Sequence, residues 1–394
     1  MPGNRIVSDQ CHMQEAYEKK CQETALSLEY SADEPLNLSS PNESGKTTPA
    51  ILPNVSGKPT YKLGPYEACT HIYTGLFSTI YLTQSPTPPP SHLAIKCTSP
   101  AREQPPHNSR REARILSSLS HPHIIPLLAT NTTTSLSCPY LLTFPYKPFT
   151  LADLLLPSSP SPIPKSLLHN LFSALAYLHD SHGIIHRDVK PTNILLSSPT
   201  GPASLADFGI AWSPTDRDSE PPGQKITDIG TTCYRAPELL FGDAAYGVGV
   251  DLWAAGCVAA EVFVHDTGGK GGRDRGKEGE EGEREWTLFD AGELGSELAL
   301  VKSIFETLGT PDEKVWPECS RFPDWGKMTF KQFAAKKWEE ILPGVGREER
   351  ELVGRLVRYE SGERMRAGEV SGFLIFTFFP PHVSLVVFEM VANG

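Results

Sequence analysis

The polar and apolar positions after Tyr66 alternate in the way that short strands require. Apolar residues on both sides of a turn at Gly75, and the run Leu93-Ala94-Ile95-Lys96 after a proline-rich loop, predict an antiparallel meander. A short helical stripe with apolar residues at 113, 115, 116 and 119 comes next. We therefore expect a small sheet followed by one helix.

The second half of the chain has the longer period of helices. Leu167 to His179 carries its apolar residues at helical spacing, which predicts an amphipathic helix. Val250 to Val264 is apolar almost all round, which predicts a fully buried helix. This half of the chain is thus expected to be mainly helical.

Three stretches lack the pattern of a packed core. We interpret 1–59 as a disordered leader, 268–285 as a solvated insertion made of glycine and charged residues, and 373–394 as an atypical apolar tail. The tail contains Pro380-Pro381, which divides it into pieces too short to cross a bilayer of about 30 Å. We expect no membrane span.

Charge and cysteine content narrow the function classes. The 394 residues include 36 Lys plus Arg and 47 Asp plus Glu, and the net charge of -11 argues against nucleic acid as a partner. The eight cysteines never fall in a CxxC spacing, so a zinc site is not indicated. With no apolar signal segment at the start, we expect reduced thiols and a cytoplasmic or nuclear location.

The strongest chemical signal lies in the middle of the chain. His186-Arg187-Asp188-Val189-Lys190-Pro191-Thr192-Asn193 is followed, 19 residues after Asp188, by Asp207-Phe208-Gly209. Phosphoryl transfer needs a carboxylate for the attacking hydroxyl, a nearby cation and oxygen ligands for Mg²⁺. Asp188 and Lys190 supply the first two, and Asn193 and Asp207 supply the metal ligands.

This ordered pair of motifs resembles the eukaryotic protein kinases, from about Tyr66 to Glu369. The resemblance implies an α+β, two-lobed protein kinase fold: a small antiparallel β-sheet N-lobe with one helix at 60–145 and a mainly helical C-lobe at 146–372. It also implies that ATP and Mg²⁺ are cofactors. The implied ATP-binding residues are Ile72, Gly75, Ile80, Ala94, Lys96, Glu112, Thr143 and Tyr146.

Within that resemblance, several residues match specific kinase roles. Lys96 is similar to the lysine that holds the α and β phosphates, and Glu112, 16 residues on, to its ion-pair partner. Glu238 of Ala236-Pro237-Glu238 is expected to pair with Arg364. Asp251 is similar to the buried carboxylate that holds the catalytic-loop backbone.

The glycine-rich loop departs from the kinase pattern. Tyr73, Gly75 and Ser78 stand at the three glycine positions, so only the middle glycine is kept. Side chains at the other two positions should restrict the approach of backbone N–H groups to phosphate. Weak nucleotide affinity is one consequence, and a kinase-fold scaffold that binds partners without catalysis is the alternative.

Further motifs suggest which kinase the chain is similar to. Lys190 and Thr231 match the serine/threonine pattern, in which Thr231 bonds Asp188 and Lys190. The runs 234–242 and 303–317 resemble the cyclin-dependent kinase branch, and most of all the fungal single-subunit kinases that activate cyclin-dependent kinases. The implied protein substrate is the activation-loop threonine of such a kinase. A proline-directed kinase of the same branch is the alternative, although Gly230 stands where such members carry valine.

Two departures from that branch concern regulation. Residues 106–111 differ from the segment that cyclins contact, so we expect a monomer that works without cyclin. Arg111 and Arg187 match two of the three arginines of the phosphothreonine pocket, whereas Trp212 replaces the third. Thr227 lies one residue away from the usual phosphothreonine, and its phosphorylation is expected to matter little.

Overall fold

The computed structural model describes residues 50–52, 59–85, 91–131, 139–159, 162–268, 286–292 and 294–373. The predicted insertion at 268–285, apart from its first residue, and nearly all of the predicted tail lie outside these ranges. Most of the predicted leader does too, although Ala50–Leu52 forms a strand within it. The described chain divides into two compact units, one of 1–102 with 129–144 and one of 103–128 with 145–394.

Among the residues that the structure describes, the first unit is built on a sheet of seven strands in the order β1-β2-β3-β4-β5-β7-β6. Consecutive strands from β1 to β5 pair antiparallel, as the predicted meander requires. The strands are β1 (Ala50–Leu52), β2 (Thr60–Leu63), β3 (Tyr66–Thr74), β4 (Ser78–Gln84), β5 (His92–Thr98), β6 (Ala129–Thr130) and β7 (Tyr140–Pro145).

One face of this sheet carries the small core of the first unit. Leu63, Cys69, Ile95 and Leu141 are buried together, and tyrosines of β2, β3 and β4 pack against them. Since side chains alternate along a strand, the neighbours of Ile95 in β5 point to the opposite face. That second face therefore presents Ala94 and Lys96, two of the predicted ATP-binding residues.

The second unit is mainly helical, with one small sheet of β10, β9 and β8. Its strands and 3₁₀ and π helices are β8 (Phe149–Thr150), β9 (Ile194–Leu196), β10 (Ala203–Leu205), η1 (Tyr177–Ser181), η2 (Pro191–Asn193), η3 (Thr232–Tyr234), η4 (Pro317–Arg321), η5 (Ser361–Glu363) and η6 (Ala367–Gly372). Its α-helices are α2 (Ser109–Ser117), α3 (Leu151–Leu154), α4 (Ser166–Ala176), α5 (Pro237–Leu240), α6 (Gly249–Asp266), α7 (Glu297–Leu308), α8 (Trp338–Ile341) and α9 (Arg347–Leu356).

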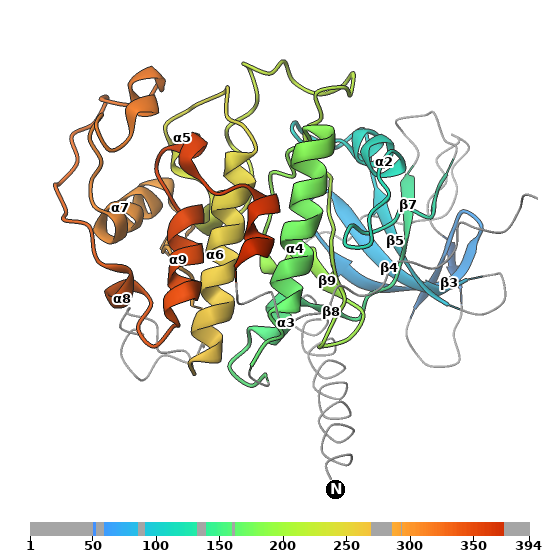
Figure 1. Ribbon diagram of the computed structural model, residues 1–394. Helices are drawn as coiled ribbons and strands as arrows, with labels where there is room; N and C mark the ends of the chain where they lie inside the picture. The colour runs from blue at the N-terminus through green and yellow to red at the C-terminus, as the bar shows by residue number, and fades with distance from the viewer. Residues whose placement is uncertain are drawn as a thin grey trace, which may run out of the picture. The chain divides into compact units, whose positions relative to one another are not determined.

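Helix α6 forms the centre of this unit, between α4 and α9 (Figure 1). Every residue from Gly249 to Val264 is buried, which confirms the prediction from its all-round apolar pattern. Gly256 permits the close approach of α9, because a Cβ there would lie only 2.7 Å from Cγ2 of Val357. Among the described residues, no helix has the length and apolar character needed to cross a membrane.

Helix α2 groups with the second unit, whereas the N-lobe predicted at 60–145 includes it, so that boundary stays a prediction. Asn108 caps the helix by accepting the backbone N–H of Arg111 at 2.8 Å. The backbone N–H of Asn108 itself donates to Gly209 O at 3.0 Å. The helix is thus fastened at its start to the segment that follows Asp207.

Candidate active site

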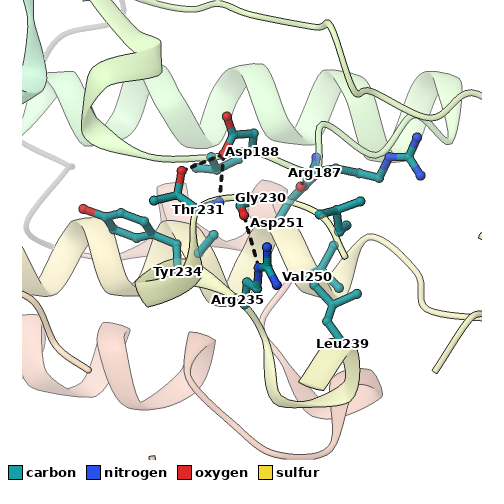
Figure 2. Close-up of a pocket in the computed structure, with 12 residues that line it drawn as sticks. Arg187, Asp188, Gly230, Thr231, Tyr234, Arg235, Leu239, Val250 and Asp251 are labelled. Carbon is teal, nitrogen blue, oxygen red and sulfur yellow. Dashed lines mark hydrogen bonds between the residues drawn. The ribbon is translucent and has the colours of Figure 1, made fainter. Parts of the chain in front are cut away.

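Asp188 lies at the centre of a hydrogen-bonded cluster in the second unit. Lys190 Nζ lies 2.9 Å from Asp188 Oδ2 and donates to Thr231 Oγ1 at 2.8 Å. Thr231 Oγ1 and its backbone N–H each lie 3.2 Å from Asp188 Oδ1 (Figure 2). The bonds predicted for Thr231 are therefore present, and they fix both the carboxylate and the cation that phosphoryl transfer requires.

Asn193 joins the same cluster from the 3₁₀ turn η2. Its Nδ2 donates to the backbone O of Asp188 at 2.8 Å and to Oδ2 of Asp188 at 2.9 Å. Because the amide nitrogen makes both bonds, Oδ1 is the atom of Asn193 that remains for a metal ion. The backbone O of Asn193 accepts from Ala206 N at 2.9 Å, which ties this turn to the residue before Asp207.

Asp251 holds the catalytic-loop backbone from inside α6. Its Oδ2 accepts the backbone N–H of His186, and its Oδ1 that of Arg187, both at 2.8 Å. His179 Nε2 lies 2.9 Å from Oδ2. Burial alone would raise the pKa of Asp251, but the hydrogen bonds and charges of His179 and His186 hold this pKa below its ordinary value. Asp251 is a scaffold residue, as the sequence predicts.

Two residues of the site adopt left-handed backbone conformations that side chains rarely take. Arg187 has φ 71° and Asp207 has φ 61°. His186 bridges the two segments, since its Nε2 lies 2.9 Å from Ala206 O and its ring contacts Phe208 edge-on. Arg187 follows His186 in the chain, and Asp207 lies between the two residues that His186 contacts. The contacts of His186 therefore help to hold both left-handed residues in place.

The activation segment is the stretch between Gly209 and Ala236. Its last part turns at Gly230. This glycine has φ 71°, and a Cβ on it would lie 2.8 Å from Arg187 O. Arg235 Nε donates to Gly230 O at 3.1 Å (Figure 2). Arg235 is itself held by Asp228, with 2.7 Å between Nη2 and Oδ1. The Gly230 carbonyl beside Thr231 is thus already bonded within the chain.

The predicted pair of Glu238 and Arg364 anchors the far end of the segment. Arg364 Nη2 donates to Glu238 Oε2 at 2.7 Å, and both side chains are almost wholly buried. Arg364 also donates to the backbone O of Gly249 at 2.9 Å and stacks over Trp253. These contacts join α5, α6 and the turn after α9.

The remaining predicted residues lie in the first unit or at its end. Strand register places Ile80 opposite Lys96, and Leu82 opposite Ala94, so these side chains share one face of the sheet. Thr143 is buried in β7 and donates to Tyr66 Oη at 3.0 Å. Ile72 lies at an irregularity of β3, and Tyr146 directly follows β7.

The turn between β3 and β4 shows how the departure from the glycine pattern is accommodated. Gly75 N donates to Ser78 O at 2.8 Å, which closes a tight turn. The ring of Tyr73, which is 55% exposed, lies against Gly75, since Cε1 is 3.3 Å from where a Cβ on Gly75 would stand.

Glu112, the predicted partner of Lys96, is buried in α2 of the second unit. The Lys96–Glu112 ion pair stays a prediction.

Sequence reasoning missed the charged residues of the activation segment. Glu220 contacts both Arg187 and Arg111, while Lys225 Nζ lies 4.9 Å from the ring centroid of Trp212. The available signal was the alternation of carboxylates at positions 216, 218 and 220, opposite arginines already singled out. No local pattern shows which carboxylate reaches which arginine.

The residues present fit the ATP–Mg²⁺ donor set of a kinase. Asn193 offers one oxygen, Asp207 offers a carboxylate, and Lys190 supplies positive charge beside Asp188. No group of three or more His, Cys, Asp or Glu side chains suited to a metal occurs among the described residues. A magnesium ion held by so few protein ligands takes its other ligands from phosphate and water.

Comparison with known proteins agrees with this geometry. The protein-family model described as "Protein kinase domain" matches residues 66–367, and the chain belongs to this family. It is similar to the serine/threonine-protein kinase csk1 of Schizosaccharomyces pombe, with 37% identity over 298 residues that cover 74% of this chain and 88% of the relative. It is also similar to cyclin-dependent kinase 7 of Carassius auratus, with 33% identity over 324 residues, 80% of this chain and 83% of the relative. Cyclin-dependent kinase 20 of Rattus norvegicus is 34% identical over 215 residues, 54% of this chain and 53% of that protein.

The family and these relatives define the chemistry. The chain is an ATP-dependent serine/threonine protein kinase of the cyclin-dependent kinase-like branch. ATP, when bound with Mg²⁺, supplies the phosphoryl group. The cluster at Asp188 brings together a carboxylate and a cation, the two groups that such a transfer requires of the protein.

Proposed function

We propose that this kinase phosphorylates the activation-loop threonine of a cyclin-dependent kinase and acts as a monomer without cyclin. Asp188 is the base that orients the substrate hydroxyl, and Lys190 stabilises the charge on the transferred phosphoryl group. Asn193 and Asp207 hold Mg²⁺, and Lys96 holds the α and β phosphates. The observation that supports catalysis most directly is the set of bonds from Thr231 and Lys190 to Asp188.

The cyclin-free part of the proposal is supported by how α2 is held. Arg114 forms a two-pronged pair with Asp216, with 2.7 and 2.9 Å between donors and oxygens, and reaches Asp218 at 2.6 Å. Arg111 donates to the backbone O of Asp218 at 3.1 Å. Contacts within the chain therefore fix the helix that carries Glu112, a task that a cyclin performs in the related kinases.

The test compares two forms of one substrate. Purified kinase is incubated with radiolabelled ATP and a cyclin-dependent kinase, or with its variant in which the activation-loop threonine is alanine. We expect label on the first protein only, and from kinase that elutes at monomer size in size-exclusion chromatography. Label on both forms contradicts the proposed target, and activity that elutes only with a cyclin-sized partner contradicts the monomer.

A second candidate, a proline-directed kinase, is favoured by the bond between Arg235 and Gly230. Arg235 Nε takes one lone pair of the Gly230 carbonyl, which makes this oxygen a poorer acceptor for the N–H of a peptide residue beside Thr231. An N–H buried there without a partner costs free energy, and proline has no N–H to lose.

Peptides distinguish the two candidates. One threonine peptide is made with proline, alanine or N-methyl-alanine after the target residue. A proline-directed kinase prefers proline and N-methyl-alanine to alanine, by about tenfold for one unsatisfied N–H. Equal rates for the three peptides favour the activation-loop target, whose following residue is then unrestricted.

A further inference from the structure

The activation segment places one carboxylate between two buried arginines. Glu220 Oε1 accepts from Arg187 Nη1 at 3.0 Å, and Oε2 accepts from Arg187 Nη2 at 3.3 Å. Arg111 Nη1 lies 3.6 Å from Glu220 Oε2. The side chains of Arg187, Arg111 and Glu220 are only 0%, 3% and 15% exposed. This is a desolvated cluster and not a surface ion pair.

The two arginines repel each other, and Glu220 offsets that repulsion. Burial and then the charge of Arg187 lower the pKa of Arg111. Burial alone would raise the pKa of Glu220, but the hydrogen bond and charge of Arg187 bring it below its ordinary value. A guanidinium pair buried without a counter-charge is strongly unfavourable. Asp216 and Asp218 also stabilise the charge of Arg111, whereas Glu220 contacts both arginines at once.

Each arginine directly precedes a residue of the active site. Arg187 comes before Asp188, and its left-handed backbone is held by Asp251. Arg111 comes before Glu112 on α2. A single carboxylate thus connects the catalytic loop with the helix that carries Glu112.

The position of Glu220 is itself fixed by other residues of the segment. Trp212 Nε1 donates to the backbone O of Glu220 at 2.8 Å. Lys225 Nζ lies over the rings of Trp212, at 4.9 Å, and Tyr246, at 5.1 Å. Tyr246 Oη accepts from Arg187 at 2.9 Å. Trp212 stands where the third arginine of the phosphothreonine pocket is expected. Through its bond to the backbone O of Glu220 it holds the Glu220 carboxylate in place.

We propose that Glu220 is a positioning residue for phosphoryl transfer, supplying from within the chain the negative charge that brings α2 and the catalytic loop together. The kinase then reaches its active arrangement with no phosphate on the activation segment. This inference rests on the kinase activity of the family and not on the proposed cyclin-dependent kinase substrate.

The test removes the charge of Glu220 and then restores it. Glu220→Gln keeps the shape of the side chain, and it should lower kcat for ATP hydrolysis by about 10- to 100-fold, the loss expected for bonds to a charged group. Phosphoserine placed at position 220 should recover at least half of the lost activity, because it restores the charge. Glu363→Gln, which alters an exposed pair with Arg358, is the matched control and should change kcat less than twofold.

Two further measurements separate positioning from simple stability. Hydrogen exchange should rise in 109–117 and 186–193 of Glu220→Gln while the KM for ATP changes less than threefold. Wild-type protein treated with a phosphatase should retain its activity within twofold. Wild-type kcat in Glu220→Gln, or loss of activity on phosphatase treatment, overturns the proposal. ATP hydrolysis reports on Glu220 even where no cyclin-dependent kinase is phosphorylated.

Discussion

Asp251 reaches from the buried helix α6 to the backbone of Arg187, whose N–H it accepts at 2.8 Å. Arg187 has φ 71°, a conformation that an arginine adopts only when its surroundings impose it. The same carboxylate accepts from His186 N and contacts His179 Nε2. The path of the catalytic loop before Asp188 therefore depends on one acidic side chain.

Asp251→Asn should lower both stability and turnover. The amide presents N–H groups where a carboxylate oxygen now accepts, and a buried donor facing a donor costs about 2–4 kcal/mol of unfolding free energy. Urea unfolding and kcat check this expectation. Asp290→Asn, at an exposed turn, is the matched control. A variant as stable as the wild type would show that Asp251 does not hold the loop.

Glycine at the two altered positions of the loop should strengthen ATP binding. The double variant Tyr73→Gly/Ser78→Gly opens the backbone to phosphate, and one added N–H bond should lower the apparent KM for ATP about fivefold. The variant Tyr73→Ala/Ser78→Ala removes the large side chains but keeps Cβ atoms, and should gain less. Equal KM values for wild type and both variants would show that the present loop already admits the phosphates.

Thr227→Ala should have little effect on activity. Thr227 is half-buried, and the arginines that would receive its phosphate are already paired with Glu220. A phosphate there would recruit little additional charge. We expect kcat within twofold of the wild type in the radiolabelled ATP assay. A tenfold loss that Thr227→Glu recovers would contradict this expectation.

Two histidines after α2 should make stability depend on pH. Burial lowers the pKa of His121, helped by the charge of His123. It also lowers the pKa of His123, against a hydrogen bond to Ala203 O. His121 Nδ1 accepts from His123 N at 3.2 Å, and Asn170 Nδ2 lies 3.2 Å from His123 Nε2. Protonation of His121 Nδ1 or of His123 Nε2 would place one N–H donor against another.

Both histidines have a lower pKa in the folded protein than in the unfolded chain, so the unfolded chain binds protons more readily. Their contribution to the unfolding free energy is therefore fully present above about pH 6.5 and falls as the pH drops below it. Chemical unfolding between pH 7 and 5 should show this loss. His123→Gln should reduce the slope, and His92→Gln, at an exposed position, should not. A wild-type slope in His123→Gln would remove His123 from this explanation.

The catalytic cluster could be predicted from the sequence because its chemistry lies in short motifs. Asp188, Lys190 and Asn193 fall within six residues, so one loop conformation brings them together. The burial of α6 was also predictable, since an apolar surface all round leaves no face for water.

Other features depend on contacts that sequence patterns do not encode. The left-handed backbone of Arg187 is imposed by Asp251, which lies 64 residues away. The ion pairs of Glu220 follow from the path of an irregular segment, whose residues have neither the spacing of a helix nor the alternation of a strand. Helix α2 lies in sequence between strands β5 and β6 of the sheet, but its Arg114 joins it to carboxylates over 100 residues further on.

Phosphoryl transfer from radiolabelled ATP by Asp188→Asn, beside the wild type, tests the central claim most directly. Loss of the base should lower turnover by about 10²- to 10⁴-fold with an unchanged circular dichroism spectrum. Lys96→Met and Asp207→Ala should each lose activity by a similar factor, whereas Lys302→Met, at an exposed pair with Glu306, should not. Near-normal turnover of folded Asp188→Asn, or a folded wild type with no transfer at all, would contradict catalysis at this site and favour a kinase-fold scaffold.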